Sequence, residues 1–296
     1  RVFINPLVCE GCGDCGVQSN CVSILPMETE FGRKRAIDQS SCNKDYSCVK
    51  GFCPSFVTVH GGGLKKSSGV KAEPDFASLP APQIKTDLSQ PWNVLITGVG
   101  GIGVVTIGAL LGMAAHLEGK GVSVLDQTGL AQKGGAVTCH VRIAAQPNDI
   151  YAVRIAAGEA DVVIGCDVVV VNDYWALSKI RTERSHAVIN SYESMPGSFT
   201  RDPDMQFPLK QMLDSIGLAL GHKNLEVLDA PDIATRLMGD SIATNLFMLG
   251  YAWQRGLVPV SFDALMRAIE LNGAAVPMNK RAFQWGRLAA HDLPQV

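Results

Sequence analysis

The sequence of 296 residues lacks an excess of either charge, because 26 lysines and arginines stand against 28 aspartates and glutamates. Domains that bind nucleic acid usually carry a clear basic excess, so we expect no nucleic-acid partner. Long apolar runs are also missing. The longest, residues 104–117, contains glycine and is shorter than a membrane-spanning helix, so we expect no membrane segment.

The sequence also lacks an export signal, which would combine a basic start with an apolar stretch. We therefore expect a cytoplasmic protein, in which thiols stay reduced and disulfides do not form. The chain starts with Arg1 rather than methionine, and we expect it to be a piece of a longer protein.

Cysteine is scarce over most of the chain, since only two of the nine cysteines lie beyond residue 53. These two, Cys139 and Cys166, stand in apolar, strand-like runs, and we expect buried free thiols there. The other seven are crowded into the first 53 residues. An odd number in one cluster argues against a complete set of disulfides and leaves a metal site.

The first cysteines read C-x2-C-x2-C, and a distant Cys-Pro follows them, as in bacterial ferredoxins. This spacing predicts one iron–sulfur cluster bound by Cys9, Cys12, Cys15 and Cys53. Gly11, Gly13 and Gly16 are expected to keep the backbone close to it. Structural zinc is the alternative, although zinc sites usually show two C-x2-C pairs.

The remaining three cysteines, Cys21, Cys42 and Cys48, are irregularly spaced and are candidates for a second site. Three ligands are one short of a complete four-iron set. The spacing leaves open a three-iron cluster, a four-iron cluster with a non-cysteine or outside ligand, or no cluster at all.

The composition divides the chain into three parts. Residues 1–63 are loop-rich, have little core and would need metal ligation for stability, as expected of a small ferredoxin-like module. Residues 64–91 carry Ser, Pro, Lys and Asp without periodicity and predict a linker. Residues 92–296 alternate strand-like and helical patterns, which predicts an α/β domain with a mostly parallel sheet flanked by helices.

The elements predicted in the third part are six strands and three helices. The strands are expected at 92–98, 122–127, 136–145, 160–167, 186–191 and 225–230, and the helices at 103–121, 232–256 and 261–273. Ser261 is the expected N-cap of the last helix.

A glycine loop follows the first of these strands. Gly98, Gly100 and Gly103, with Gly101 between them, satisfy G-x-G-x-x-G at a strand–helix turn, where free amides favour a phosphate. Asp126 stands about where a nicotinamide enzyme would place its ribose-binding acid. The alternative is that the glycines only permit tight packing and that Asp126 is a turn residue.

A second glycine-rich loop follows Asp126 and leads into the next strand. Its candidate residues for binding a phosphate-bearing ligand or a partner are Gln132, Lys133, Gly134 and Gly135. An ordinary nicotinamide fold would continue into a crossover helix here instead. The segment could also be a wide hairpin connection.

The combination of these stretches resembles indolepyruvate ferredoxin oxidoreductase, in particular its long, fused form, among the 2-oxoacid:ferredoxin oxidoreductases. The resemblance is carried by "CEGCGDCGVQSNC", "CNKDYSCVKGFCPSF", "ITGVGGIGVVTIGALLGMAA", "GLAQKGGAV" and "IATNLFMLGYAWQRGLVPVS". It implies a ferredoxin-like module followed, from about residue 92, by a gamma-type domain.

The resemblance further implies oxidative decarboxylation of an aryl 2-oxoacid to its acyl-coenzyme A, with electrons leaving through one or two 4Fe–4S clusters to ferredoxin. The implied cofactors are thiamine diphosphate with magnesium, and coenzyme A is the co-substrate. The cysteines named above would bind the clusters. Both glycine loops would lie where the gamma-type domain meets the thiamine-binding domains, and the assembly would be a homo-oligomer.

No thiamine-binding G-D-G…N-N motif is present, because "GDS" at 239–241 lacks the second glycine of that motif. No Ser/His/Asp set or carboxylate pair stands out either, so we predict no catalytic residue in this chain. Two other hypotheses remain: an electron-transfer and docking protein without chemistry of its own, and a nicotinamide- or flavin-dependent oxidoreductase that uses the glycine loop.

Overall fold

The computed structural model describes residues 1–39, 41–62, 74–129, 135–202 and 204–296. Its contacts divide the chain into two compact units. The first, here called the cysteine unit, consists of residues 1–66 together with residues 193–208. The second, the α/β unit, consists of residues 67–192 and 209–296. The chain therefore passes between the units three times.

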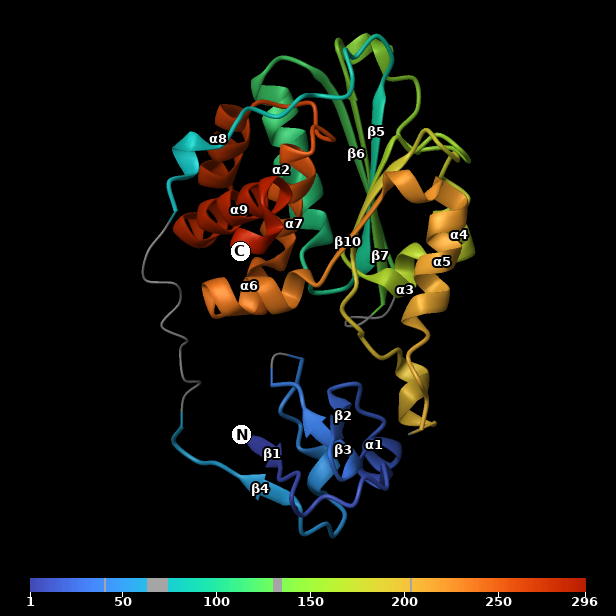
Figure 1. Cartoon of the computed structure of the whole chain (residues 1–296), viewed down its shortest axis with the longest axis vertical. Helices are drawn as coiled ribbons and strands as arrows, with labels where there is room; N and C mark the ends of the chain where they lie inside the picture. The colour runs from blue at the N-terminus through green and yellow to red at the C-terminus, as the bar shows by residue number, and fades with distance from the viewer. Residues whose placement is uncertain (40, 63–73, 130–134, 203) are drawn as a thin grey trace. The chain divides into compact units, whose positions relative to one another are not determined.

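A six-stranded sheet forms the centre of the α/β unit, in the order β10-β9-β8-β5-β7-β6 (Figure 1). Strands β10, β9, β8 and β5 run parallel to one another, whereas β7 pairs antiparallel with β5 and with β6. The mostly parallel sheet and all six predicted strands are confirmed. Their bounds are Trp92–Val99 (β5), Gly121–Thr128 (β6), Ala136–Ala144 (β7), Val162–Gly165 (β8), His186–Asn190 (β9) and Leu225–Leu228 (β10).

Helices cover both faces of this sheet (Figure 1). One face carries α2 (Val104–Leu117), α6 (Ala230–Met238), α7 (Thr244–Gln254), α8 (Phe262–Asn272) and α9 (Val276–His291). The other face carries α3 (Val168–Val171), α4 (Tyr174–Leu177) and α5 (Leu209–Leu220). The main core lies between the sheet and the first group of helices. Within the described residues, no helix has the length and apolar character needed to cross a membrane.

The single helix predicted over 232–256 is wrong, because the chain forms α6 and α7 there. Gly239 ends α6 in the left-handed conformation, with φ of 78°, and Asp240 then caps a short turn before α7. The predicted cap of α8 is confirmed, since Ser261 Oγ accepts a hydrogen bond from Ala264 N at 3.2 Å. The short helices α3 and α4 and the longer helices α5 and α9 were not predicted.

The described part of the predicted linker belongs to the α/β unit and packs against its helices. Of residues 64–91 the structure describes those from 74 onward. The Phe76 ring meets the Trp285 ring edge-on with centroids 5.4 Å apart, and the Pro80 carbonyl accepts a hydrogen bond from Gln254 Nε2 at 2.7 Å. Lys85 N donates to the Gly256 carbonyl at 2.9 Å. This stretch is an extended strap held at several points along the α/β unit.

The cysteine unit has little regular structure. Its elements are β1 (Val2–Ile4), α1 (Asp14–Ser19), β2 (Ile24–Thr29), β3 (Gly32–Ile37) and β4 (Phe56–Thr58). Strands β1 and β4 form one antiparallel pair, and β2 and β3 form another. The core consists of buried Ile4, Cys9 and Ile24, against which further aliphatic, aromatic and cysteine side chains pack. A core this small contributes little folding free energy, so bound metal would add to the stability of the unit.

Candidate functional site

The first predicted cysteine group gathers around the start of α1. Cys9 and Cys12 precede the helix and Cys15 lies in its first turn, whereas Cys53 precedes β4. Burial, with smaller contributions from the neighbouring thiols of Cys12, Cys9 and Cys53, raises the pKa of Cys15 to about 11. These four thiols are therefore close enough to interact electrostatically.

The second group gathers in the same way. Burial raises the pKa of Cys48, and the thiols of Cys21 and Cys42 add to this effect. Lys44 N lies 3.4 Å from Cys42 Sγ and donates to it, the kind of amide–sulfur contact that stabilises a thiolate. The thiols of Cys21, Cys42 and Cys48 are therefore also close enough to interact electrostatically.

The residues present fit an iron–sulfur cluster. None of the nine cysteines forms a disulfide, and Cys9, Cys15, Cys21 and Cys48 pack in or against the small core of the unit. Among the described residues, no three His, Cys, Asp or Glu side chains converge on a point where a single metal ion would be held. Unpaired cysteine thiols are the ligands that an iron–sulfur cluster takes, so the chemistry of this set of side chains suits such a cluster.

Two glycines set the path of the loop that carries the first group. Gly11 and Gly13 have φ of 80° and 81°, a conformation that side chains with a Cβ rarely adopt. A Cβ on Gly11 would also overlap the Arg33 carbonyl oxygen of β3. Gly16, which was expected to serve the same purpose, lies in α1 with nothing near its Cβ position, so no close approach requires it.

The glycine loop of the α/β unit joins the carboxyl end of β5 to the start of α2. Gly101 and Gly103 have φ of 99° and 87°. Gly103 is the N-cap of α2 and provides no side-chain cap, and a Cβ there would overlap the Asn245 amide of α7. Gly98 lies in β5, where a Cβ would come within 2.7 Å of Ile102 and Val104 side chains. Tight packing and uncapped amides therefore occur together in this loop.

The structure also connects the two predicted glycine loops. Gly100 N donates a hydrogen bond to the Gly135 carbonyl at 2.8 Å, so the end of the second loop lies beside the first. The other candidates of the second loop, Gln132, Lys133 and Gly134, lie outside the described residues.

Asp126 does not take the place of a ribose-binding acid. Strand β6 continues past it to Thr128, and β7 separates β6 from β5, the strand that carries the glycine loop. Asp126 pairs in register with Cys139 of β7 and accepts a hydrogen bond from its thiol, which helps burial to raise the pKa of Cys139. The two later thiols, Cys139 and Cys166, are buried, as predicted.

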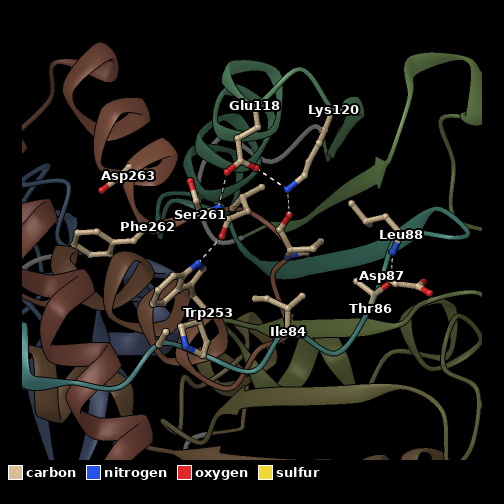
Figure 2. Close-up of a pocket in the computed structure, with 14 residues that line it drawn as sticks. Ile84, Thr86, Asp87, Leu88, Glu118, Lys120, Trp253, Ser261, Phe262 and Asp263 are labelled. Carbon is tan, nitrogen blue, oxygen red and sulfur yellow. Dashed lines mark hydrogen bonds and ion pairs between the residues drawn. The ribbon is translucent and has the colours of Figure 1, made fainter.

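A separate groove of about 620 Å³ lies beside the strap (Figure 2). Its polar centre is Glu118, at the end of α2, which accepts hydrogen bonds from Ser261 N at 2.8 Å and from Lys120 Nζ at 2.6 Å. Lys120 Nζ also donates to the Pro259 carbonyl at 2.7 Å. None of the predicted cysteines and glycines lines this groove. The hydrogen bonds of Glu118 and Lys120 tie the connection after α2 to residues 259–261.

We expect Glu118→Gln to lower the free energy of unfolding of the α/β unit by about 1 kcal/mol, the usual scale for a partly exposed ion pair. Burial alone would raise the pKa of Glu118, but Lys120 and Ser261 outweigh it and hold the pKa below its ordinary value. The stabilisation is therefore present above pH 4.5 and is lost on acidification. Chemical denaturation at pH 7 and pH 4, with Lys120→Met completing a double-mutant cycle, measures both effects.

A cationic cluster surrounds a buried histidine on the other face of the sheet. His140 of β7 accepts a hydrogen bond from Ile155 N at Nδ1 (3.0 Å), and its Nε2 has no hydrogen-bond partner among the described residues. Its ring meets Trp175 edge-on at 5.3 Å, and the cations of Lys179 and Arg154 lie 5.0 and 5.9 Å from the Trp175 ring centre.

This environment predicts a pH-dependent stability. Burial, followed by the charges of Arg154, Lys179 and Arg142, lowers the pKa of His140 from 6.5 to about 4. The unfolded chain therefore binds the proton more readily, and stability falls as the pH drops below 6.5. We expect a loss of about 1 kcal/mol between pH 7 and pH 5.5. His140→Gln should flatten this part of the profile in urea unfolding followed by fluorescence, and an unchanged slope would contradict the assignment.

The sequence analysis missed the contribution of residues 193–208 to the cysteine unit. This stretch connects β9 to α5 and is much longer than the usual connection in such folds. Its length, its three prolines and its lack of periodicity were the only signals of an insertion.

Comparison with known proteins identifies the α/β unit. The family model described as pyruvate ferredoxin/flavodoxin oxidoreductase matches residues 93–289. The indolepyruvate oxidoreductase subunit IorB of Methanothermobacter thermautotrophicus is 27% identical over 201 residues, covering 67% of this chain and 97% of that protein. The IorB subunit of Pyrococcus horikoshii is 28% identical over 204 residues, covering 68% of this chain and 97% of that protein.

A solved structure shows the same fold. It is a 2-oxoglutarate:ferredoxin oxidoreductase from Magnetococcus marinus, with a TM-score of 0.51 and 16% identity, and the match covers 69% of this chain and 31% of that one. Residues 1–92, which include all seven cysteines of the cysteine unit, lie outside the range of the family model, whereas residues 193–208 of that unit lie inside it. The family model spans well over half of the sequence, and the chain belongs to the pyruvate ferredoxin/flavodoxin oxidoreductase family.

Proposed function

We propose that this chain is the electron-transfer and gamma-type part of an indolepyruvate ferredoxin oxidoreductase of the fused form, acting on aryl 2-oxoacids. The observation that carries the proposal is the family match over residues 93–289, in the same chain as two groups of cysteines. The relatives named indolepyruvate oxidoreductase subunit IorB support this choice among 2-oxoacids.

In this proposal Cys9, Cys12, Cys15 and Cys53 hold one 4Fe–4S cluster, and Cys21, Cys42 and Cys48 contribute to a second. A cluster bound by these thiolates would accept and release single electrons. The chain keeps these thiols free of disulfides and fixes their loop through Gly11 and Gly13. It also buries Cys9 and leaves Cys12 and Cys53 exposed. Electrons would leave toward ferredoxin in the cytoplasm.

The α/β unit would dock the thiamine-binding domains of the enzyme, which supply thiamine diphosphate and magnesium. The docking surface would be the linked glycine loops, residues 98–103 and 132–135, with the uncapped start of α2 available to a phosphate-bearing ligand such as coenzyme A. Nicotinamide binding is disfavoured, because β7 separates the loop from Asp126 and the Cys139 thiol already contacts this acid.

The proposal is tested on the enzyme as it is isolated without oxygen. Indolepyruvate and coenzyme A together should reduce ferredoxin, and pyruvate or 2-oxoglutarate should be poorer substrates. Iron and sulfide should each reach about four per chain, or about seven to eight if the second group binds a cluster. Stoichiometric zinc without iron would contradict the cluster assignment.

A thiamine motif in the same reading frame would support the fused form, and a separate gene for it would contradict that form.

A further inference from the structure

The connection between β9 and α5 contributes a second piece of chain to the cysteine unit. Residues 193–208, here called the insert, group by their contacts with residues 1–66 rather than with the strand and helix that they connect. Its ordered turn, Gly197–Thr200, places Phe199 and Thr200 in buried positions, with 5% and 4% of their surface exposed.

The insert holds strand β3 through two arginines. Arg35 is 2% exposed, and its guanidinium lies 5.3 Å from the centre of the Phe199 ring. A desolvated cation over an aromatic face is among the stronger contacts of this kind. Arg33 donates to the Met205 carbonyl at 2.8 Å and to Gln206 Oε1 at 3.0 Å. The same arginine's carbonyl oxygen occupies the space that a side chain on residue 11 would need, so β3 directly supports the loop of the first cysteine group.

The insert also holds the end of α1. Asn20 ends this helix in the left-handed conformation, with φ of 48°, between Cys15 in the helix and Cys21 directly after it. The Thr200 hydroxyl shares its proton between Asn20 Oδ1 at 3.0 Å and the Gly197 carbonyl at 2.8 Å. One turn of the insert therefore fixes the junction between a cysteine of the first group and a cysteine of the second.

We propose that the insert is a structural part of the iron–sulfur module, and that Phe199 and Thr200 are positioning residues that keep β3 and the end of α1 where the cysteines can bind their clusters. The identity of the bound group rests on the proposed function. The positioning role itself rests on contacts of the protein alone, and it predicts that a module cut at residue 63 lacks a necessary piece.

Phe199→Ala and Thr200→Val in the full chain test this inference, with Ser198→Ala as the matched control. Ser198 lies in the same turn and is exposed, and the nearest partner of its hydroxyl is Met205 Sδ of the insert itself, at 3.7 Å. Phe199→Ala should speed the release of iron to a chelator about tenfold, because a buried aromatic side chain is removed. Thr200→Val should have a smaller effect in the same direction, and Ser198→Ala should have none.

Two further measurements make the test independent of the cluster. In the iron-free chain, Phe199→Ala should raise the alkylation rates of Cys15 and Cys21 about tenfold over the unmutated chain, while buried Cys139 and Cys166 of the α/β unit keep their rates. All four tryptophans, Trp92, Trp175, Trp253 and Trp285, belong to the α/β unit, so their fluorescence reports its unfolding separately. We expect this transition to stay unchanged.

The outcomes separate the two proposals. Equal iron release and equal thiol alkylation in Phe199→Ala and the unmutated chain would overturn the inference. A large fall in the tryptophan transition would overturn it as well, because the insert would then support the α/β unit. A chain that takes up no iron would remove the cluster from the proposed function, while the alkylation rates would still decide whether the insert positions the cysteines.

Discussion

Gly250→Ala is expected to lower the stability of the α/β unit by about 3 kcal/mol, and Gly286→Ala by a similar amount. Helices α7 and α9 cross so closely that a Cβ on either glycine would overlap a backbone carbonyl of the opposite helix. Gly250 faces the Phe283 carbonyl, and Gly286 faces the Phe247 carbonyl. Because backbone atoms cannot turn away as a side chain can, the helices would have to separate.

The measurement is thermal unfolding followed by tryptophan fluorescence. A loss of about 3 kcal/mol corresponds to a midpoint about 10 °C lower for a unit of this size. Gly112→Ala in α2 is the matched control, because the nearest atom to its Cβ position is the end of the Val124 side chain, at 2.8 Å. This variant should stay within about 1 kcal/mol. An unfolding midpoint for Gly250→Ala equal to that of the unmutated chain would show that the crossing is looser than described.

The position of α7 also affects the packing of the glycine loop. Asn245, five residues before Gly250 on α7, occupies the space over Gly103 at the start of α2. A displaced α7 would therefore change the packing of the loop that we propose as a docking surface. If Gly250→Ala or Gly286→Ala weakens the binding of the thiamine-binding domains while the cysteine unit is unchanged, the cause would be the altered helix packing.

The strands were predictable because each is a short apolar run bounded by glycine or polar residues. Their order was not, because the sheet inserts β7 antiparallel between β5 and β6, and no local pattern tells a strand which neighbour it will pair with. The expectation for Asp126 failed for this reason: its position along the sequence suits a nicotinamide site, but its position in the sheet does not.

The helices show which local signals were available. The break between α6 and α7 was visible as Gly239 followed by the capping residue Asp240. Helix α5 has an amphipathic pattern that follows Pro208, so it too had a local signal. The length and prolines of the insert indicated an extra segment but not its partner, because the contacts that make it part of the cysteine unit join residues more than 160 positions apart, for example Thr200 and Asn20.

The two sets of cysteines could be predicted from the sequence, whereas the contacts that support them could not. Spacing along the chain separated the cysteines into two sets, and the same sets interact in the folded unit. Spacing works here because a cluster needs its thiolates on a short loop plus one remote residue. It could not supply the supporting contacts from β3 and the insert, which depend on tertiary packing.

Cys15→Ala and Cys48→Ala are expected to remove different clusters, and this is the largest effect that we predict on function. Cys15 interacts with the thiols of Cys12, Cys9 and Cys53, so its loss should remove about four iron atoms per chain and most electron transfer to ferredoxin. Cys48 interacts with Cys21 and Cys42, so its loss should remove only the iron of the second group. Cys166→Ala, a buried thiol of the α/β unit, is the control and should leave the iron content unchanged.

Iron analysis and low-temperature electron paramagnetic resonance of the reduced chains distinguish these outcomes. The unmutated chain should show the signals of two interacting clusters. Cys15→Ala and Cys48→Ala should each show the signal of a single cluster. This signal should lack the broadening that a neighbouring paramagnetic cluster causes. Because ligation contributes folding free energy, Cys15→Ala should also expose the cysteine unit to proteolysis while the tryptophan transition of the α/β unit stays in place. If Cys48→Ala keeps the full iron content, the second group binds no metal and electrons pass through the first cluster alone.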